Sequence, residues 1–330
     1  MRRKVLTRRS PAVVATLVAL ALTVAACGGS SNSADSSSSA DTSTPATGSG
    51  DAAGILSAID TKASTGPQKL KLDVNVDIKG TPANQQLALF TKQPIHLGLD
   101  GVIDSTGKSA DVNVSVTLGK SPLEAEIRTG GGKSWIQIDG KWYDLPANVL
   151  SSTTGTSLPA GVSTSNLDAG KILGAIGDPA KLLDNASVSS DTVEGIDSDK
   201  VSGDVNIEGV AAAAANLSTS LGNSTTTAPS QAQIDKTVTQ LKKIVKKAHV
   251  DVWVGKSDHK VHRVALTLDA SMDDATKKSS GIDAATIDFD VTTTDASAPD
   301  ISAPSSVGTA AEFQAAVVGL LGKVMGGAGG

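Results

Sequence analysis

Hydrophobic and polar residues alternate along much of the chain after Leu70. From Leu70 to Ile78 every second residue is apolar, and those between are Lys, Asp or Asn, so a strand here has one buried and one solvated face. The same period of two returns in the segments 95–99, 112–118, 123–127, 250–254, 264–268 and 287–291. Strands that are polar on one side are typical of antiparallel sheet, one face of which stays in contact with solvent.

Turn residues join these segments. Residues 135–138 and 141–143 flank the pair Asp139-Gly140, which favours a two-residue turn, so they predict a β-hairpin. Residues 104–107 predict a second turn. The glycines 130–132 precede a strand rather than a helix, which makes them a turn and not a phosphate-binding loop.

Helical patterns lie before and between the strand groups. Residues 55–63 predict a short helix, and residues 178–183 predict a helix start with Pro179 in the first turn. The alanine-rich stretch 210–221 and residues 234–245, with lysines near their C-terminal end, predict two more. The order of helix, strands, helical block and strands again is an α+β pattern rather than alternating βαβ units.

Small residues precede a cysteine at the end of the N-terminal apolar run, in the sequence Val24-Ala25-Ala26-Cys27. Five basic residues lie ahead of the run, which extends from Ala12 to Ala26 and is shorter than the about 20 residues of a spanning helix. We therefore expect residues 1–26 to be a lipoprotein signal peptide. The pair Arg8-Arg9 lacks the apolar residues that follow a twin-arginine signal, which favours general secretion.

Cys27 is the only cysteine of the chain, so it has neither a disulfide partner nor a second thiolate for a metal. Acylation is the role that remains for its thiol. Two or three acyl chains hold a protein on a membrane more firmly than one, since each buried methylene contributes about 0.8 kcal/mol. We expect Cys27 to be the lipidation site and to anchor the protein to the cell membrane, on its extracytoplasmic face.

The composition changes after Cys27. Residues 28–50 are almost all Ser, Gly, Ala, Thr and Asp, so residues 27–50 predict an acylated, disordered tether before a folded domain over 51–304. Loss of residues 1–26 removes five basic and no acidic residues, which leaves 24 basic against 34 acidic and a net charge of −10. Such a charge argues against nucleic acid as a partner.

No pattern in the sequence predicts catalysis, a metal site or a cofactor. The histidines lack supporting ligands, and on one strand His259 and His262 would point to opposite faces. Glu124 and Glu126 share a strand face, but their alternation with apolar residues favours a solvated face over an acid–base pair. No nucleophile elbow or phosphate-binding loop occurs. We therefore expect no enzyme.

Four stretches carry a family resemblance: the hairpin 135–146 with "DGKWY", the segment 177–183, the segment 192–203 with "VEGIDSDKVSG", and the strand pair 250–254 and 264–268. In these stretches and their order, the chain resembles the LppX/LprG type of LolA-like lipoproteins of actinobacteria. The resemblance covers most of residues 51–304. It implies a strongly curved antiparallel sheet, a half-barrel, that helices close over a hydrophobic cavity.

Proteins of that family take the acyl chains of lipids or glycolipids into the cavity, so the resemblance implies a carrier in the cell envelope, with an envelope transporter as a further partner. The apolar strand residues that we expect to line the cavity are Leu72, Val74, Val76, Leu97, Val112, Val114, Val116, Val252 and Leu266. An interior that packs solid gives the alternative, a structural or surface lipoprotein without a ligand. A sugar-binding module with Trp135 and Trp142 is a third class, disfavoured because aromatic residues are few.

The alanine-rich helical block and the tail after Pro304 depart from the family pattern. In the segment 305–330 an apolar stripe with helical spacing precedes a glycine-rich end; it consists of Phe313, Ala316, Val317, Leu320, Leu321 and Val324. Such a helix can dock on the sheet, cap the mouth of a cavity or lie on the membrane. A disordered end is the alternative to all three.

Overall fold

The structure is a computed structural model. It describes residues 51–60, 66–82, 88, 90–104, 107–118, 121–145, 179–209 and 231–327. The predicted signal peptide, the lipidation site Cys27 and the tether lie outside the described residues, as does the alanine-rich stretch 210–221.

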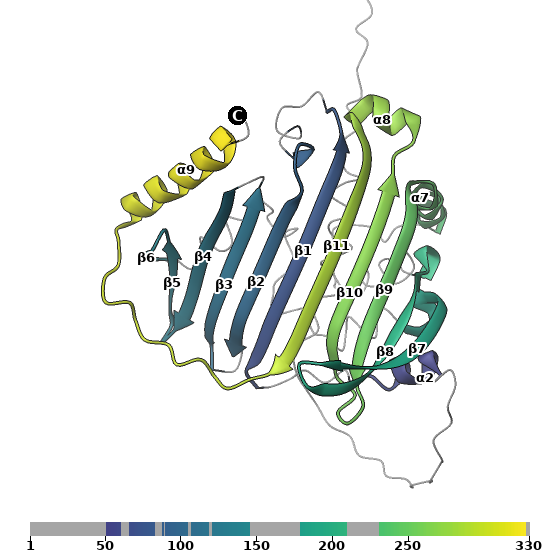
Figure 1. Cartoon of the computed structure of the whole chain (residues 1–330), viewed down its shortest axis with the longest axis horizontal. Coiled ribbons are helices and arrows are strands. Elements are labelled where there is room, and N and C mark those ends of the chain that lie inside the picture. The colour runs from purple at the N-terminus through teal and green to yellow at the C-terminus, as the bar shows by residue number, and fades with distance from the viewer. Residues whose placement is uncertain are drawn as a thin grey trace, which may run out of the picture.

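Eleven strands of the described residues form one antiparallel sheet (Figure 1). In chain order they are β1 (Gln68–Gly80), β2 (Ile95–Asp104), β3 (Ser109–Leu118), β4 (Ser121–Gly130), β5 (Lys133–Ile138), β6 (Lys141–Asp144), β7 (Leu183–Val193), β8 (Ile196–Val205), β9 (Val245–Gly255), β10 (Val261–Ser271) and β11 (Ile282–Asp295). Their order in the sheet is β6-β5-β4-β3-β2-β1-β11-β10-β9-β8-β7. The last strand therefore pairs with the first, and the pairing of β11 with β1 joins two meanders into a single sheet.

The sheet is open, with β6 and β7 at its edges, and it curves strongly. Glu194, in the β7–β8 turn, lies 3.8 Å from Lys69 of β1 between carboxylate and amine, although three strands separate β8 from β1. Because neighbouring strands are about 4.8 Å apart, this contact requires the β7–β8 hairpin to bend over the face that carries Lys69. The large curved antiparallel sheet of the sequence prediction is confirmed.

The register divides the residues between two faces. One row of paired residues crosses β3, β4, β5 and β6 and consists of Val112, Ile127, Ile136 and Tyr143. A second row on the same side crosses β2, β1 and β11 and consists of Leu99, Leu72 and Val291. We call this side of the sheet the apolar face. The residues between them, such as Lys71, Asp73 and Asp290, lie on the opposite side, the polar face. A shift by one residue would exchange the two faces, so the alternation specifies the register.

Five helical segments accompany the sheet among the described residues: α2 (Ala52–Ser57), the 3-10 turn η2 (Pro179–Leu182), α7 (Gln231–Ile244), α8 (Asp274–Ser280) and α9 (Ala310–Gly327). Helix α7 lies on the apolar face, where Ile244 packs in a cluster with Leu268 and Ile287. Asp273 caps the N-terminus of α8, and Gly281 ends it in a left-handed conformation. None of the helices in this part of the chain is long and apolar enough to cross a bilayer.

The helix start predicted over residues 178–183 is present in its described part only as a short 3-10 segment. Pro179 begins a single 3-10 turn, and Leu183 already belongs to β7, where it pairs with Val205 of β8. Asp184 and Asn185 follow, and both residue types are poor helix formers. Pairing with β8 therefore prevails over the start signal of the proline.

After β11 the chain runs along the ends of β1 to β4 before it reaches α9 (Figure 1). We call residues 296–309 the C-terminal strap. The amide of Ala296 donates to the carbonyl of Pro67 over 2.9 Å, and the amide of Gly308 donates to the carbonyl of Trp142 over 2.7 Å. Between these points Ile301 covers Gly130, where an added Cβ would lie 2.7 Å from the isoleucine side chain. The strap is thus attached at both ends and in the middle.

Candidate functional site

The structure brings all nine predicted lining residues to the apolar face. Leu97 of β2 pairs with Val74 of β1 and with Val116 of β3, which places three of them side by side. On the other half of the sheet, Leu266 of β10 pairs with Phe289 of β11, which in turn pairs with Val74. One continuous apolar surface therefore extends from β3 to β10.

Burial varies along this face. Leu72, Val74, Val76, Leu97, Leu99, Val114 and Val116 are only half-buried, and we call these residues of β1, β2 and β3 the half-buried strip. Toward β10 and β11 the face becomes buried, with Phe289 2% and Ile287 5% exposed. Toward β5 and β6 it is buried again, with Ile138 4% and Tyr143 5% exposed. The strip is thus an incompletely covered aliphatic surface between two packed ends.

Two of the predicted residues on the second half of the face, Val252 and Leu266, are also half-buried and pack against the cluster of Val264, Phe289 and Val291. Val112 differs from the other predicted residues, because it is only 6% exposed.

Helix α9 covers the β6 end of the apolar face. Tyr143 and Lys141 both belong to that face, since they pair with Ile136 and Ile138 of β5. The ring of Phe313 in α9 lies 5.7 Å from the ring of Tyr143, centroid to centroid. The phenylalanine therefore continues the apolar contacts of the sheet beyond its edge strand.

Polar contacts fix the first turn of α9. The Lys141 ammonium donates to the Glu312 carboxylate over 2.5 Å. The other oxygen of Glu312 accepts from the Thr309 amide over 2.7 Å, and the Glu312 amide donates to the Thr309 hydroxyl over 3.3 Å, which is a capping box. The hydrogen bond from Lys141, followed by those from Thr309, lowers the pKa of Glu312 from 4.5 to about 2.

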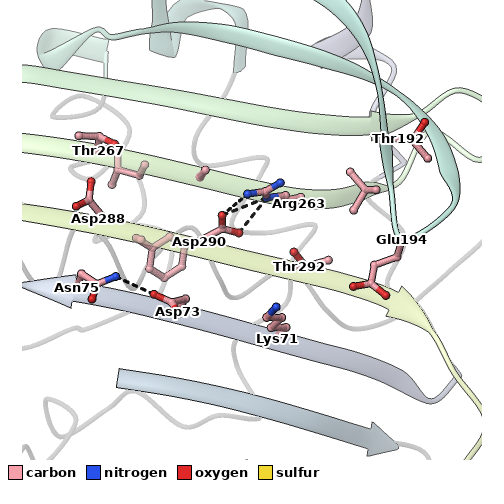
Figure 2. A pocket seen from close by; sticks show the side chains of 14 residues that line it. Lys71, Asp73, Asn75, Thr192, Glu194, Arg263, Thr267, Asp288, Asp290 and Thr292 are labelled. Carbon is pink, nitrogen blue, oxygen red and sulfur yellow. Dashed lines mark hydrogen bonds and ion pairs between the residues drawn. The ribbon is translucent and has the colours of Figure 1, made fainter. Parts of the chain in front are cut away.

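A pocket of about 510 Å³ lies on the polar face, beneath the β7–β8 turn (Figure 2). Strands β1, β10 and β11 form its floor, and Thr192 to Glu194 border it from the hairpin. Figure 2 shows polar side chains over most of the floor, among them Lys71, Asp73, Asn75, Thr267, Asp288 and Thr292. Of the nine predicted lining residues, only Leu266 borders this pocket.

Most of the charged groups of the pocket are engaged with protein partners. The Arg263 guanidinium binds both oxygens of Asp290, at 2.5 Å for the shortest contact. This hydrogen-bonded pairing raises the pKa of Arg263. Asp73 accepts from the Asn75 amide over 2.9 Å and contacts the His96 ring over 2.9 Å. These contacts form a surface network that connects β1, β2, β10 and β11 on the polar face.

The histidines do not gather into a metal site. His259 lies in the β9–β10 turn with a φ of 53°, so it does not share a strand with His262. His262 of β10 is 3% exposed and contacts Asp258 and the carbonyl of Thr293. Among the described residues, no group of three or more His, Cys, Asp or Glu side chains is arranged to hold a metal ion.

The predicted pair of carboxylates on β4 lies on the polar face. Glu124 is exposed, whereas Glu126 forms an ion pair with Arg128 at 2.6 Å. The Arg128 guanidinium also stacks on Trp142, 4.8 Å from the ring centroid. Glu126, Arg128 and Trp142 therefore form a network of side chains on the polar face of the sheet.

Sequence reasoning missed Tyr143 and Lys141 as the contact site of α9. The spacing of Thr309 and Glu312 matches the capping box S/T-x-x-E, which marks the first residue of the helix. That signal could have placed the start of α9. Nothing in the sequence indicates which strand the helix would meet, because that depends on the path of the strap.

No family model matches the sequence, and a search of the curated proteins finds no match either. Among solved structures, the chain is similar to the crystal structure of LprF from Mycobacterium bovis, with 14% sequence identity and a TM-score of 0.34. The similarity covers 79% of this chain and 100% of that chain. An overlap this loose does not establish family membership.

Proposed function

We propose that this protein is a membrane-anchored lipoprotein that binds the acyl chains of a lipid or glycolipid against the half-buried strip and carries them through the cell envelope. The observation that supports this best is the strip itself, an aliphatic surface on β1, β2 and β3 that is left half-covered between two packed ends. The predicted acylation of Cys27 would keep the domain near its lipid source.

The chemistry of the strip suits a hydrocarbon ligand. Its side chains are Leu and Val, which offer no hydrogen-bonding groups, so they favour a ligand that needs none. Each methylene that leaves water gains about 0.8 kcal/mol, which makes affinity depend on chain length rather than on a headgroup. The proposal includes no catalytic step.

Two substitutions on the same strand test the proposal. Val114→Asp places a charge on the half-buried strip, whereas Asn113→Asp places the same charge at an exposed position on the polar face. An acyl chain that covers the new carboxylate removes it from water, which is unfavourable. We therefore expect Val114→Asp to weaken the binding of a fluorescent long-chain fatty acid about tenfold or more. Asn113→Asp should bind like the unmodified chain.

Circular dichroism of both variants controls for folding. Equal binding by the two variants, with both folded, would contradict the proposal that the ligand lies against the strip.

A further inference from the structure

Helix α9 is held less firmly than the other long helix of the apolar face. Ile244 of α7 is 5% exposed and belongs to the main core cluster. In α9 none of the side chains from Ala311 to Leu320 is buried, and Val318 is 68% exposed. Among the described elements, the helix makes its main contacts with the edge strand β6 and with β4.

The inner side of α9 has the same chemistry as the ligand proposed above. Phe313, Ala316, Val317 and Leu320 are its half-buried residues, and their spacing places them on one side of the helix. Since Phe313 packs on Tyr143, this side faces the apolar face of β6. An acyl chain that extends from the half-buried strip toward β6 meets α9 and competes with it for the same surface.

From these observations we infer that α9 is a displaceable lid of the acyl-chain site, latched by the Lys141–Glu312 ion pair and the Tyr143–Phe313 contact. This inference rests on the proposed function. The strap provides the attachment, because Gly308 stays bonded to Trp142 while the helix beyond it carries the latch residues. The lid regulates when the β6 end of the apolar face is open to a ligand.

The latch is accessible to solvent, which suits a contact that must open. The Lys141 and Glu312 side chains are each 48% exposed. Exposed ion pairs of this kind contribute little to stability, so thermal motion breaks them often. A helix held by an exposed ion pair and by side chains that are only half-buried can leave the sheet without unfolding the core.

The test measures lipid transfer by the full chain reconstituted on phosphatidylcholine vesicles. Donor vesicles carry a self-quenched fluorescent phosphatidylcholine, and the increase of fluorescence over protein-free vesicles gives the rate of transfer. The variants Lys141→Gln and Phe313→Ala each remove one half of the latch. We expect each to speed transfer about two- to tenfold, because the open population rises as the latch weakens.

A locked form provides the opposite test. In the double variant Lys141→Cys and Glu312→Cys, a short reducible bismaleimide joins α9 to β6. We expect this crosslink to slow transfer to the protein-free background, and its reduction to restore the rate in the same sample. Restoration also shows that the variant is folded.

Lys242→Gln is the matched control, because Lys242 and Glu208 form an exposed ion pair of 2.6 Å that involves α7 and not α9. It should transfer like the unmodified chain. If the locked form transfers as fast as the reduced form, the lid is refuted while the acyl-chain site stands. If the unmodified chain transfers nothing above background, the proposed function fails, and the lid fails with it.

Discussion

Trp253 shows how single residues hold the curved part of the sheet. The Lys200 ammonium lies 4.9 Å and the Arg263 guanidinium carbon 4.5 Å from its ring centroid. Its indole N–H donates to Asp191 over 2.8 Å, and this bond is the main cause that lowers the pKa of Asp191. One buried ring therefore connects β7, β8, β9 and β10. Trp253 lies on the polar face, so it is not part of the alternating apolar pattern of β9 in the sequence.

The substitution Arg263→Lys tests this network. A lysine keeps the charge but loses the two-pronged contact to Asp290 and the planar stacking on Trp253, so we expect the free energy of unfolding to fall by about 1–2 kcal/mol. Urea denaturation followed by tryptophan fluorescence measures the change. A midpoint equal to that of the unmodified chain would show that the cluster contributes nothing to stability.

Gly308 is a second residue whose role follows from its surroundings. A Cβ at this position would lie 2.8 Å from the Tyr143 ring. We therefore expect Gly308→Ala to push the strap off β6 and to raise amide hydrogen exchange at the start of α9. Gly319→Ala is the control, since an added Cβ there meets no atom within 4 Å. Alanine is also more favourable than glycine inside a helix, by about 1 kcal/mol. Equal exchange in the two variants would contradict the tight contact at Gly308.

At the scale of elements, the first turn of α9 depends on one carboxylate that caps the helix and pairs with β6. The pKa of Glu312 is lowered to about 2 in the folded protein, from an ordinary 4.5. The contribution of Glu312 to holding α9 on β6 is complete above pH 4.5, where the carboxylate is ionised whether or not the helix is docked. This contribution is lost as the pH falls through about 2.

Acidification from pH 5 to pH 2 should therefore lower the protection of the α9 amides against hydrogen exchange, taken relative to the intrinsic exchange rate at each pH, by a step that the variant Glu312→Gln lacks. Hydrogen exchange with mass spectrometry resolves the peptide that contains residues 309–320. A step of equal size in Glu312→Gln would assign the effect to other groups.

The elements also show what the sequence predicts and where it stops. The strands β1 to β4 and the central parts of β9, β10 and β11 follow from a period of two, because each has one face against apolar neighbours. The β5–β6 hairpin follows from the Asp139-Gly140 turn. Strand β7 was missed, since it lies at an edge and most of its side chains are exposed. The short helix α8 was missed too, although Asp273 and Gly281 are typical caps, because seven residues carry no apolar period.

The candidate site was predictable only in part. Alternation identified which residues share the apolar face, and all nine predicted positions lie there. How deeply each of these residues is buried depends on which elements pack on the apolar face, and no local pattern in the sequence indicates that. The contact of Phe313 with Tyr143, 170 residues earlier in the chain, depends on the pairing of β11 with β1 and on the strap that follows.

For the whole molecule, the arrangement to explain is a half-buried strip between a firmly packed end at α7 and a lightly held end at α9. A structural lipoprotein with a solid interior would instead pack the strip like the rest of the core. The substitution Val114→Trp separates these readings. At a site with space we expect a small change in melting temperature and reduced fatty-acid binding, whereas overpacking of a solid core costs about 1–3 kcal/mol. A large fall in melting temperature with unchanged binding would favour the solid interior.

Native mass spectrometry of the full chain, purified gently from its membrane, tests the central claim most directly. If acyl chains lie against the half-buried strip, the spectrum contains species heavier than the acylated protein by the mass of one lipid or glycolipid. Val114→Asp should remove them, and Asn113→Asp should keep them. A spectrum with only the lipid-free protein in both the unmodified chain and Asn113→Asp would contradict the account.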